Sequence, residues 1–294
     1  MKRSLYIIIG VLALVYGKSV ATPLKGVAYT KEDSLTITRL LSEMSLVGDT
    51  CLSLHFARQF LERPYVAHTL ELFPVQERLI VNTRELDCTT LVETVVALVL
   101  CVRQQRTSFA DYCSVLTRLR YHQGICTDYP SRLHYFSDWI DDNTQMGLVR
   151  EVQKSTFPFT AFQKLNINYM SRHPNAYAAL RKHPEFVKVI AEQERTLTGK
   201  RYRYIPKSEV RNNAALRAVV HDGDIIAITC NKPGLDIAHL GFALWRKDGL
   251  HLLNASMIHK KVVIEPMTLD KYLAKHPSHT GIRVVRIQNV FNNK

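Results

Sequence analysis

The sequence predicts an α+β fold, with mostly helical segments first and an antiparallel sheet in the last third of the chain. Up to about residue 207 the apolar residues recur mainly at helical spacing, and beyond it they form strand-like runs. A long apolar helix opens at Cys88, and two apolar strands joined by a turn at Lys247-Asp248-Gly249 carry His239 and Asn254. These observations predict a nucleophile at a helix N-terminus that packs on an antiparallel sheet, with additional helices around it.

The first elements are two helices and two short strands. We expect a helix over 31–47, because its apolar residues approximate one stripe and Gly48-Asp49 ends it. A second helix is expected over 50–62, since the residue before Pro64 avoids helical geometry. Short strands are expected at 69–72 and 79–82.

The helix expected over 88–103 is the centre of the prediction. Its apolar residues cover more than one face, which predicts burial on several sides; they are Leu91, Val92, Val95, Val96, Leu98, Val99 and Val102. Further helices are expected over 108–120 and from Tyr129 through Ile140, followed by a polar, largely helical stretch. The expected strands are 224–229, a run around Ala238, a run around His251, and 281–287.

The start of the chain has the pattern of a secretory signal peptide. Lys2 and Arg3 precede an apolar run over 5–16 and the small residues Ser19-Val20-Ala21. The run is shorter than the ~20 residues that a membrane-spanning helix needs. We therefore expect a signal peptide over 1–21, a periplasmic or secreted protein without stable membrane insertion, and one catalytic domain over 22–294 with a helical insertion around 104–207.

Charge and cysteine content limit the class of partner. The formal net charge is +13, and removal of Lys2, Arg3 and Lys18 with the signal leaves +10. The basic residues are scattered and no nucleic-acid-binding motif is present, so we expect no nucleic-acid partner. The six cysteines show no metal-ligand spacing, which predicts no metal site. Cys51 and Cys126 are the two that could form a disulfide in an oxidising compartment.

Cys88, His239 and Asn254 are the candidate catalytic residues. Unpaired N–H groups at a helix N-terminus favour a thiolate, so we expect a lowered pKa for Cys88. A histidine within hydrogen-bond reach of the sulfur would act as base and acid, and a third polar group would fix its ring. This is the layout of a papain-like cysteine peptidase core. The alternatives are a buried helix cysteine, a structural histidine and an ordinary sheet-edge asparagine.

Several motifs, in this order along the chain, resemble the NlpC-type cell-wall cysteine peptidases. They are Pro64-Tyr65, Asp87-Cys88-Thr89, Gly223-Asp224 and His239-Leu240-Gly241. Three longer runs are similar to the exported N-acetylmuramoyl-L-alanine amidase-like branch of that superfamily: Asp87 through Glu93, Tyr129 through Ile140, and Gly234 through Gly241. The resemblance spans about residues 33 to 290.

The resemblance implies Cys88 as nucleophile, His239 as general base and acid, and Asn254 as the group that orients the imidazole. The third residue is often histidine in these families, and asparagine orients a ring without supplying charge. Tyr65, Arg132 and Asp236 are the candidate substrate-binding residues. Arg132 would bind a substrate carboxylate by a forked ion pair, although a structural arginine beside a helix-capping Ser131 is an equally good interpretation. Here Tyr65 is followed by Val66-Ala67-His68, where the family usually has a glycine.

The expected function is that of an exported cysteine amidohydrolase that acts on peptidoglycan or muropeptides without a cofactor. The bond is either the amide between muramic acid and L-alanine or a γ-D-glutamyl link to a diamino acid. The alternatives are an inactive envelope-binding module and a thioester-forming acyltransferase.

Overall fold

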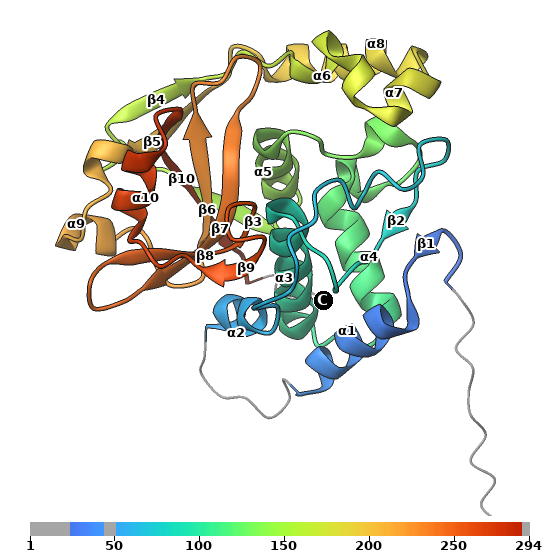
Figure 1. Ribbon diagram of the computed structural model, residues 1–294, viewed down its shortest axis with the longest axis horizontal. Helices are drawn as coiled ribbons and strands as arrows, with labels where there is room; N and C mark the ends of the chain where they lie inside the picture. The colour runs from blue at the N-terminus through green and yellow to red at the C-terminus, as the bar shows by residue number, and fades with distance from the viewer. Residues whose placement is uncertain (1–23, 44–50, 290–294) are drawn as a thin grey trace, which may run out of the picture.

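The structure is a computed structural model that describes residues 24–43 and 51–289. Most N-terminal helices gather on one side and the C-terminal strands on the other, with α3 (Cys88–Arg103) between them (Figure 1). The other helices are α1 (Lys31–Glu43), α2 (Leu52–Arg58), α4 (Phe109–Arg120), α5 (Phe136–Gln145), α6 (Tyr169–Arg172), α7 (Ala178–Lys182), α8 (Glu185–Leu197), α9 (Ala214–Arg217) and α10 (Leu269–Lys275). The strands are β1 (Val27–Ala28), β2 (Leu79–Ile80), β3 (Val149–Val152), β4 (Ala161–Lys164), β5 (Arg201–Pro206), β6 (Ile225–Cys230), β7 (Ile237–Trp245), β8 (Leu250–Ser256), β9 (Lys261–Ile264) and β10 (His279–Ile287). The predicted α+β class is confirmed, and the predicted signal segment 1–21 lies outside the described residues.

Helix α3 is buried on all sides, as its apolar composition predicts. Every residue from Thr90 to Cys101 is buried. The helix contacts α4 on one side and β7 and β8 on the other, within one continuous apolar cluster. Each fully buried Leu or Val side chain stabilises the fold by about 1.5–3 kcal/mol, so this helix is a fixed support for its first residue, Cys88.

The main sheet has the strand order β4-β5-β10-β6-β7-β8-β9, with β3 also paired to β10. All of these pairings are antiparallel. In β7, Leu240 and Phe242 pack in the cluster that contains α3, whereas Ala243 packs in a second cluster with α10 on the opposite face. Because both faces are covered, β7 and its neighbours carry apolar residues in nearly every position.

Two local predictions in the first half of the chain are wrong. Residues 69–72 form turns rather than a strand, because Glu71 is held by an ion pair to Arg132 and its N–H donates to the His68 carbonyl. The helix expected from Tyr129 through Ile140 is broken: a short 3₁₀ turn covers Tyr129–Ser131, and α5 starts at Phe136. Arg132 between them is extended and bridges to Tyr121.

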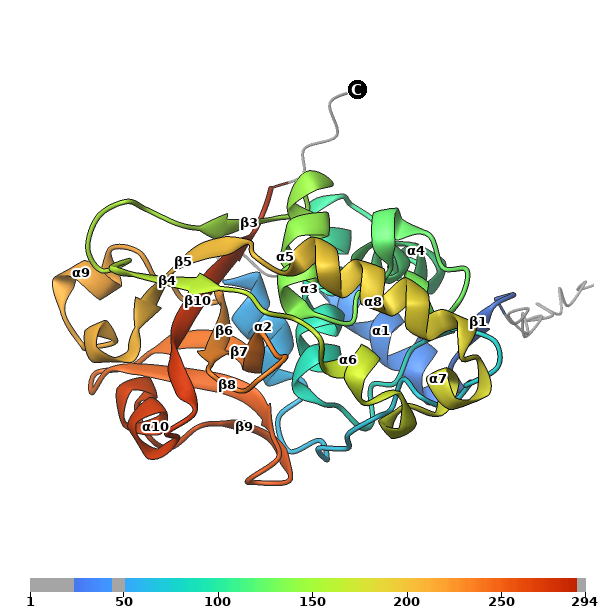
Figure 2. The ribbon, with the colours of Figure 1, turned by 90° about the horizontal axis from the view of Figure 1, so that it is seen from above.

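The stretch 104–207 is only partly helical. It contributes β3, β4 and β5, and two of these strands pair directly with β10 of the main sheet. Helices α6, α7 and α8 lie together along one side of the molecule (Figure 2). They share an apolar cluster with Tyr129 and Tyr135, so the segment before α5 is packed against them. Within the described residues, no helix combines the length and apolarity needed to cross a membrane.

Candidate active site

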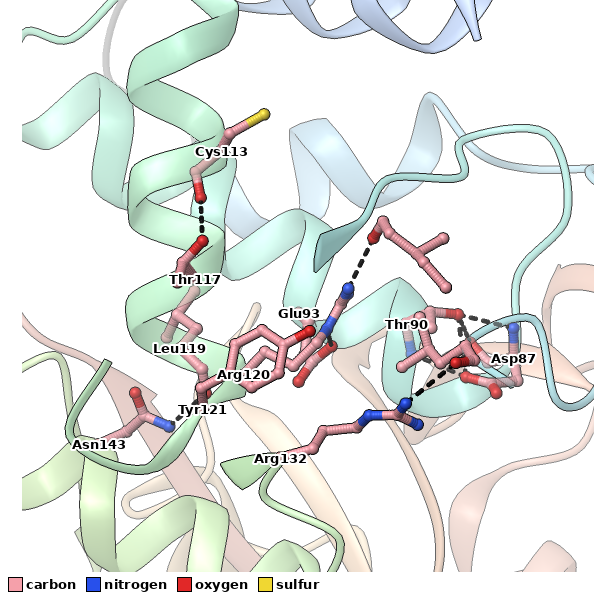
Figure 3. Close-up of polar contacts among 12 residues, drawn as sticks. Asp87, Thr90, Glu93, Cys113, Thr117, Leu119, Arg120, Tyr121, Arg132 and Asn143 are labelled. Atoms are coloured by element: carbon pink, nitrogen blue, oxygen red, sulfur yellow. Dashed lines mark hydrogen bonds and ion pairs between the residues drawn. The ribbon is translucent and has the colours of Figure 1, made fainter. Parts of the chain in front are cut away.

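Cys88 is the first residue of α3, and a capping box fixes its place. The Asp87 carboxylate accepts a hydrogen bond from the Thr90 N–H at 2.8 Å, and the Thr90 hydroxyl oxygen accepts one from the Asp87 N–H at 2.9 Å (Figure 3). This reciprocal arrangement satisfies two backbone donors at the start of the helix. The Asp87-Cys88-Thr89-Thr90 sequence therefore holds the thiol at the N-terminus of a buried helix.

The thiol of Cys88 does not have the lowered pKa that its position at a helix start suggests. Burial and then the neighbouring Asp87 carboxylate raise its pKa to about 12, against hydrogen bonds from the backbone of Leu240 and from Thr89. Removing the charged sulfur from water outweighs the favourable backbone groups. Cys88 is therefore a neutral thiol in this state, and a base must take its proton during attack.

His239 and Asn254 are brought together on adjacent strands, as the sequence predicts. His239 lies on β7 and its Nε2 is 3.0 Å from Oδ1 of Asn254 on β8. The Asn254 amide nitrogen donates to the Leu252 carbonyl at 3.2 Å. With the amide nitrogen used there, Oδ1 is the acceptor, so His239 carries its proton on Nε2 and keeps a lone pair on Nδ1.

Gly241 is what lets Asn254 approach His239. It lies two residues after His239, on the same face of β7, and the register sets it opposite Asn254. A Cβ at Gly241 would lie 2.9 Å from the Asn254 Cβ and 2.7 Å from the Leu253 carbonyl oxygen. The His-x-Gly spacing in the sequence is thus a packing requirement of this histidine–asparagine pair.

The protonation state of His239 suits a general base. Burial lowers its pKa below the ordinary 6.5, although the Asn254 bond and the Glu265 carboxylate oppose this, while His276 lowers it further. The imidazole is neutral near pH 7 and its Nδ1 can accept a proton. Its proton-accepting form is thus the resting form.

Cys88 and His239 line the same cleft, which has a volume of about 210 Å³. One wall comes from β7 and the residues just before it, and another from the segment that leads into α5. Met170 and Tyr177, from the α6–α8 region, complete it. Both candidate catalytic side chains are therefore open to the same bound ligand.

Tyr65 and Asp236 also lie at this site. The pKa of Tyr65 is raised to about 12 by burial and then by Cys88 and Asp87, and its backbone pairs with Leu86, two residues before Cys88. Asp236 lines the cleft, is buried, and accepts a hydrogen bond from the Ser137 N–H in the first turn of α5 at 2.6 Å. Their substrate-binding roles stay predictions.

Arg132 is buried and fully engaged. It donates to Glu77 at 3.0 and 2.7 Å, to Glu71 at 2.6 Å and to the Leu70 carbonyl at 3.0 Å (Figure 3 shows it near Arg120 and Asp87). All three nitrogens of the guanidinium are therefore used inside the protein. The geometry favours the structural interpretation of this arginine over a forked bond to a substrate carboxylate.

The sequence patterns did not predict one buried ion pair near the site. Glu93, in the second turn of α3, is buried and bonds Nε of Arg120 from the last turn of α4 at 2.7 Å, while Arg120 also donates to the Ile80 carbonyl (Figure 3). A carboxylate in the middle of an otherwise apolar buried helix is the signal that points to such a partner. The pair fixes α3 to α4 just behind Cys88.

The cysteines form no disulfide. All six are free thiols, so the pairing considered for Cys51 and Cys126 is wrong. Cys51 instead lies against the Asp222 carbonyl. Among the described residues, no group of three or more His, Cys, Asp or Glu side chains is arranged to hold a metal ion.

Comparison with known proteins identifies the family. No curated protein matches the chain. An N-acetylmuramoyl-L-alanine amidase from Bacteroides uniformis is 40% identical, with a TM-score of 0.75 over 81% of this chain and 98% of that one. A protein named as a xylanase candidate from Bacteroides fragilis is 42% identical, with a TM-score of 0.74 over 80% of this chain and 100% of that one.

A Legionella pneumophila protein shares the fold at 23% identity, with a TM-score of 0.64 over 87% of this chain and 94% of that one. Residues 55–282 match the family described as AmiA-like, N-acetylmuramoyl-L-alanine amidase-like. This range contains Cys88, His239 and Asn254, and it covers most of the chain. The chain therefore belongs to the AmiA-like family of N-acetylmuramoyl-L-alanine amidase-like proteins.

Proposed function

We propose that this protein is an exported cysteine amidohydrolase that cleaves an amide bond in peptidoglycan peptides. The observation that carries the proposal is a thiol at the start of a buried helix in the same cleft as a histidine whose ring is held by Asn254. Family membership supports an amidase. We also propose that the core is papain-like and that the chain shares the NlpC-type arrangement, since a helix N-terminus carries the nucleophile and an antiparallel sheet carries the base.

The reaction proceeds through a thioester. As Cys88 Sγ attacks the amide carbonyl, its proton passes to Nδ1 of His239, and the carbonyl oxygen becomes an oxyanion. The backbone N–H of Cys88 is at the first helical position and serves as an oxyanion donor. His239 then gives the proton to the leaving amine and the C–N bond breaks. A water molecule, deprotonated by His239, releases the acid and restores the thiol.

The amide between muramic acid and L-alanine is the favoured bond. The Bacteroides uniformis protein with 40% identity is named for hydrolysis of that bond. A γ-D-glutamyl link to a diamino acid is the second choice. Because the signal segment 1–21 lies outside the described residues, export rests on its sequence pattern alone.

Digestion of purified muropeptides, with products identified by mass spectrometry, tests the proposal. The mature protein should cleave, and Cys88→Ala should not. Cys51→Ala is the matched control, because this thiol lies at the start of α2 and lines a different cleft. Cleavage that survives Cys88→Ala would reject a cysteine mechanism. If the surviving cleavage breaks a sugar–sugar bond, the protein is a glycosidase instead. Absence of cleavage by the unmodified protein would favour the binding module, and transfer to an added amine would favour the acyltransferase.

A further inference from the structure

Two carboxylates line the cleft beside Cys88, and no lysine or arginine is found among its described lining residues. The acids are Glu71 and Asp236, and the two lining histidines do not offset them. Burial, followed by the charge of Arg132, lowers the pKa of His134 to about 3, and burial lowers that of His239. The cleft is therefore acidic in a chain whose formal net charge is +13.

Only one of the two carboxylate oxygens of Glu71 has a hydrogen-bond partner. Its Oε1 accepts from Arg132, whereas its Oε2 is buried without a hydrogen-bond partner. Arg132 is shared with Glu77, so one guanidinium offsets two carboxylates. The three side chains together keep a net charge of −1. A buried carboxylate oxygen without a donor is costly, and a ligand that brings a donor would remove that cost.

Two tyrosine side chains line the same cleft as this carboxylate. Tyr129 is 4% exposed, lines the cleft, and its hydroxyl also has no hydrogen-bond partner. Tyr177 lines the cleft as well, and its pKa is raised to about 12 by burial and then by Tyr169, Glu71 and Glu194. The Arg132 guanidinium already lies over the Tyr129 ring, 4.9 Å from its centroid, so the ring of Tyr177 is the aromatic face left for a ligand. A carboxylate in the same part of the cleft as this ring suits an ammonium group, which gains charge-assisted hydrogen bonds and a contact to the aromatic face.

We infer that the part of the cleft formed by Glu71, Tyr129 and Tyr177 binds the primary ammonium group of a diamino-acid residue in the substrate. The inference rests on the proposed function for the identity of the substrate. It goes beyond it by assigning the recognised group: a free, positively charged amine rather than a sugar hydroxyl or a carboxylate. A neutral hydroxyl would leave the net negative charge of Glu71, Glu77 and Arg132 without a counter-charge.

Binding to the Cys88→Ala protein tests this subsite without turnover. Two stem peptides are compared by isothermal titration calorimetry at pH 7, one with the free side-chain amine of its diamino acid and one with that amine acetylated. The free amine should bind about 10- to 100-fold more tightly, the range of a charge-assisted hydrogen bond. Glu71→Gln in the same background should bring the ratio close to one.

Glu192→Gln is the matched control, because this glutamate pairs with Arg195 on the surface of α8 and its side chain is 56% exposed. It should keep the full preference for the free amine. Tyr177→Leu removes the aromatic ring without touching the Glu71–Arg132 ion pair, so it tests the subsite even where Glu71→Gln unfolds; the preference should fall severalfold. Equal affinity for the two peptides overturns the inference, and so does failure of both peptides to bind. A preference for the free amine that persists in a folded Glu71→Gln protein also overturns it.

Turnover separates this inference from the proposed function. The same two peptides, each joined to N-acetylmuramic acid, are given to the unmodified protein. Amine-dependent binding without any turnover would keep the subsite and reject the hydrolase. Equal turnover of both substrates would reject the subsite and keep the hydrolase.

Discussion

Replacement of Gly241 by alanine should damage the candidate site through packing alone. The new Cβ would lie 2.7 Å from both the Leu253 carbonyl oxygen and the Leu252 Cγ, and 2.9 Å from the Asn254 Cβ. Only the Leu252 side chain can turn away, since the carbonyl belongs to the backbone of β8. The strand must therefore shift by a few tenths of an ångström at the residue that holds His239.

The expected magnitudes follow from that shift. Overpacking of a well-packed site costs about 1–3 kcal/mol of unfolding free energy, so the protein should still fold. A misplaced catalytic group costs about 100-fold in rate for a displacement near 1 Å. We expect Gly241→Ala to lower kcat/KM for muropeptides by about 10- to 100-fold, mainly through kcat, because neither Gly241 nor Asn254 lines the cleft itself.

The assay combines urea unfolding with muropeptide kinetics in a double-mutant cycle. If Gly241→Ala acts through Asn254, then Asn254→Ala should lose a similar amount of activity, and the double variant should lose little more. Gly281→Ala is the matched control for stability, because its Cβ would meet the Ile205 carbonyl oxygen on another strand. Normal activity of Gly241→Ala, or full additivity with Asn254→Ala, would refute the reasoning.

Three further predictions follow from charge and burial. Alkylation of Cys88 by iodoacetamide, followed by peptide mass spectrometry, should accelerate about tenfold per pH unit from pH 7 to pH 10, since its pKa is about 12; a rate that is flat over this range would show a thiolate already formed. The acid limb of the pH profile of kcat/KM should lie below pH 6.5, because activity is lost only as pH falls through the lowered pKa of His239. Asn254→Asp should move this limb to higher pH, because a carboxylate beside the ring favours the imidazolium. An unchanged limb would exclude Asn254 as the partner of the ring. Glu93→Ala should lower the free energy of unfolding, measured in urea, by about 3–5 kcal/mol, because it leaves Arg120 buried and unpaired. Glu43→Ala, in the exposed pair with Arg39, is the control and should lower it by less than about 1 kcal/mol. Equal losses of unfolding free energy would contradict a structural role for the buried pair.

The sequence predicts the supports of the site better than its walls. Helix α3 and strands β6, β7 and β8 have long apolar runs, and local patterns of this kind are enough to place Cys88 and His239. The contact between His239 and Asn254 depends on the register of two strands. The motif implied that contact, and the structure supplies its distance.

The walls depend on contacts between distant segments. Arg132 reaches Glu71 and Glu77, which lie more than fifty residues earlier, and those bonds turn an expected strand and helix into loops. Strand β5 alternates arginine and tyrosine and has a polar texture, so only its pairing with β4 and β10 makes it a strand. No local pattern encodes these partners.

The protonation states of Cys88 and His239 agree with asparagine as the third residue. Asn254 fixes the ring but brings no negative charge to hold an imidazolium, and Asp87 disfavours a thiolate on Cys88. A resting thiolate–imidazolium pair is therefore disfavoured at both Cys88 and His239. The two charges form only while the proton moves during attack. Because the thiolate is the form that oxidants attack, a neutral Cys88 is protected between turnovers.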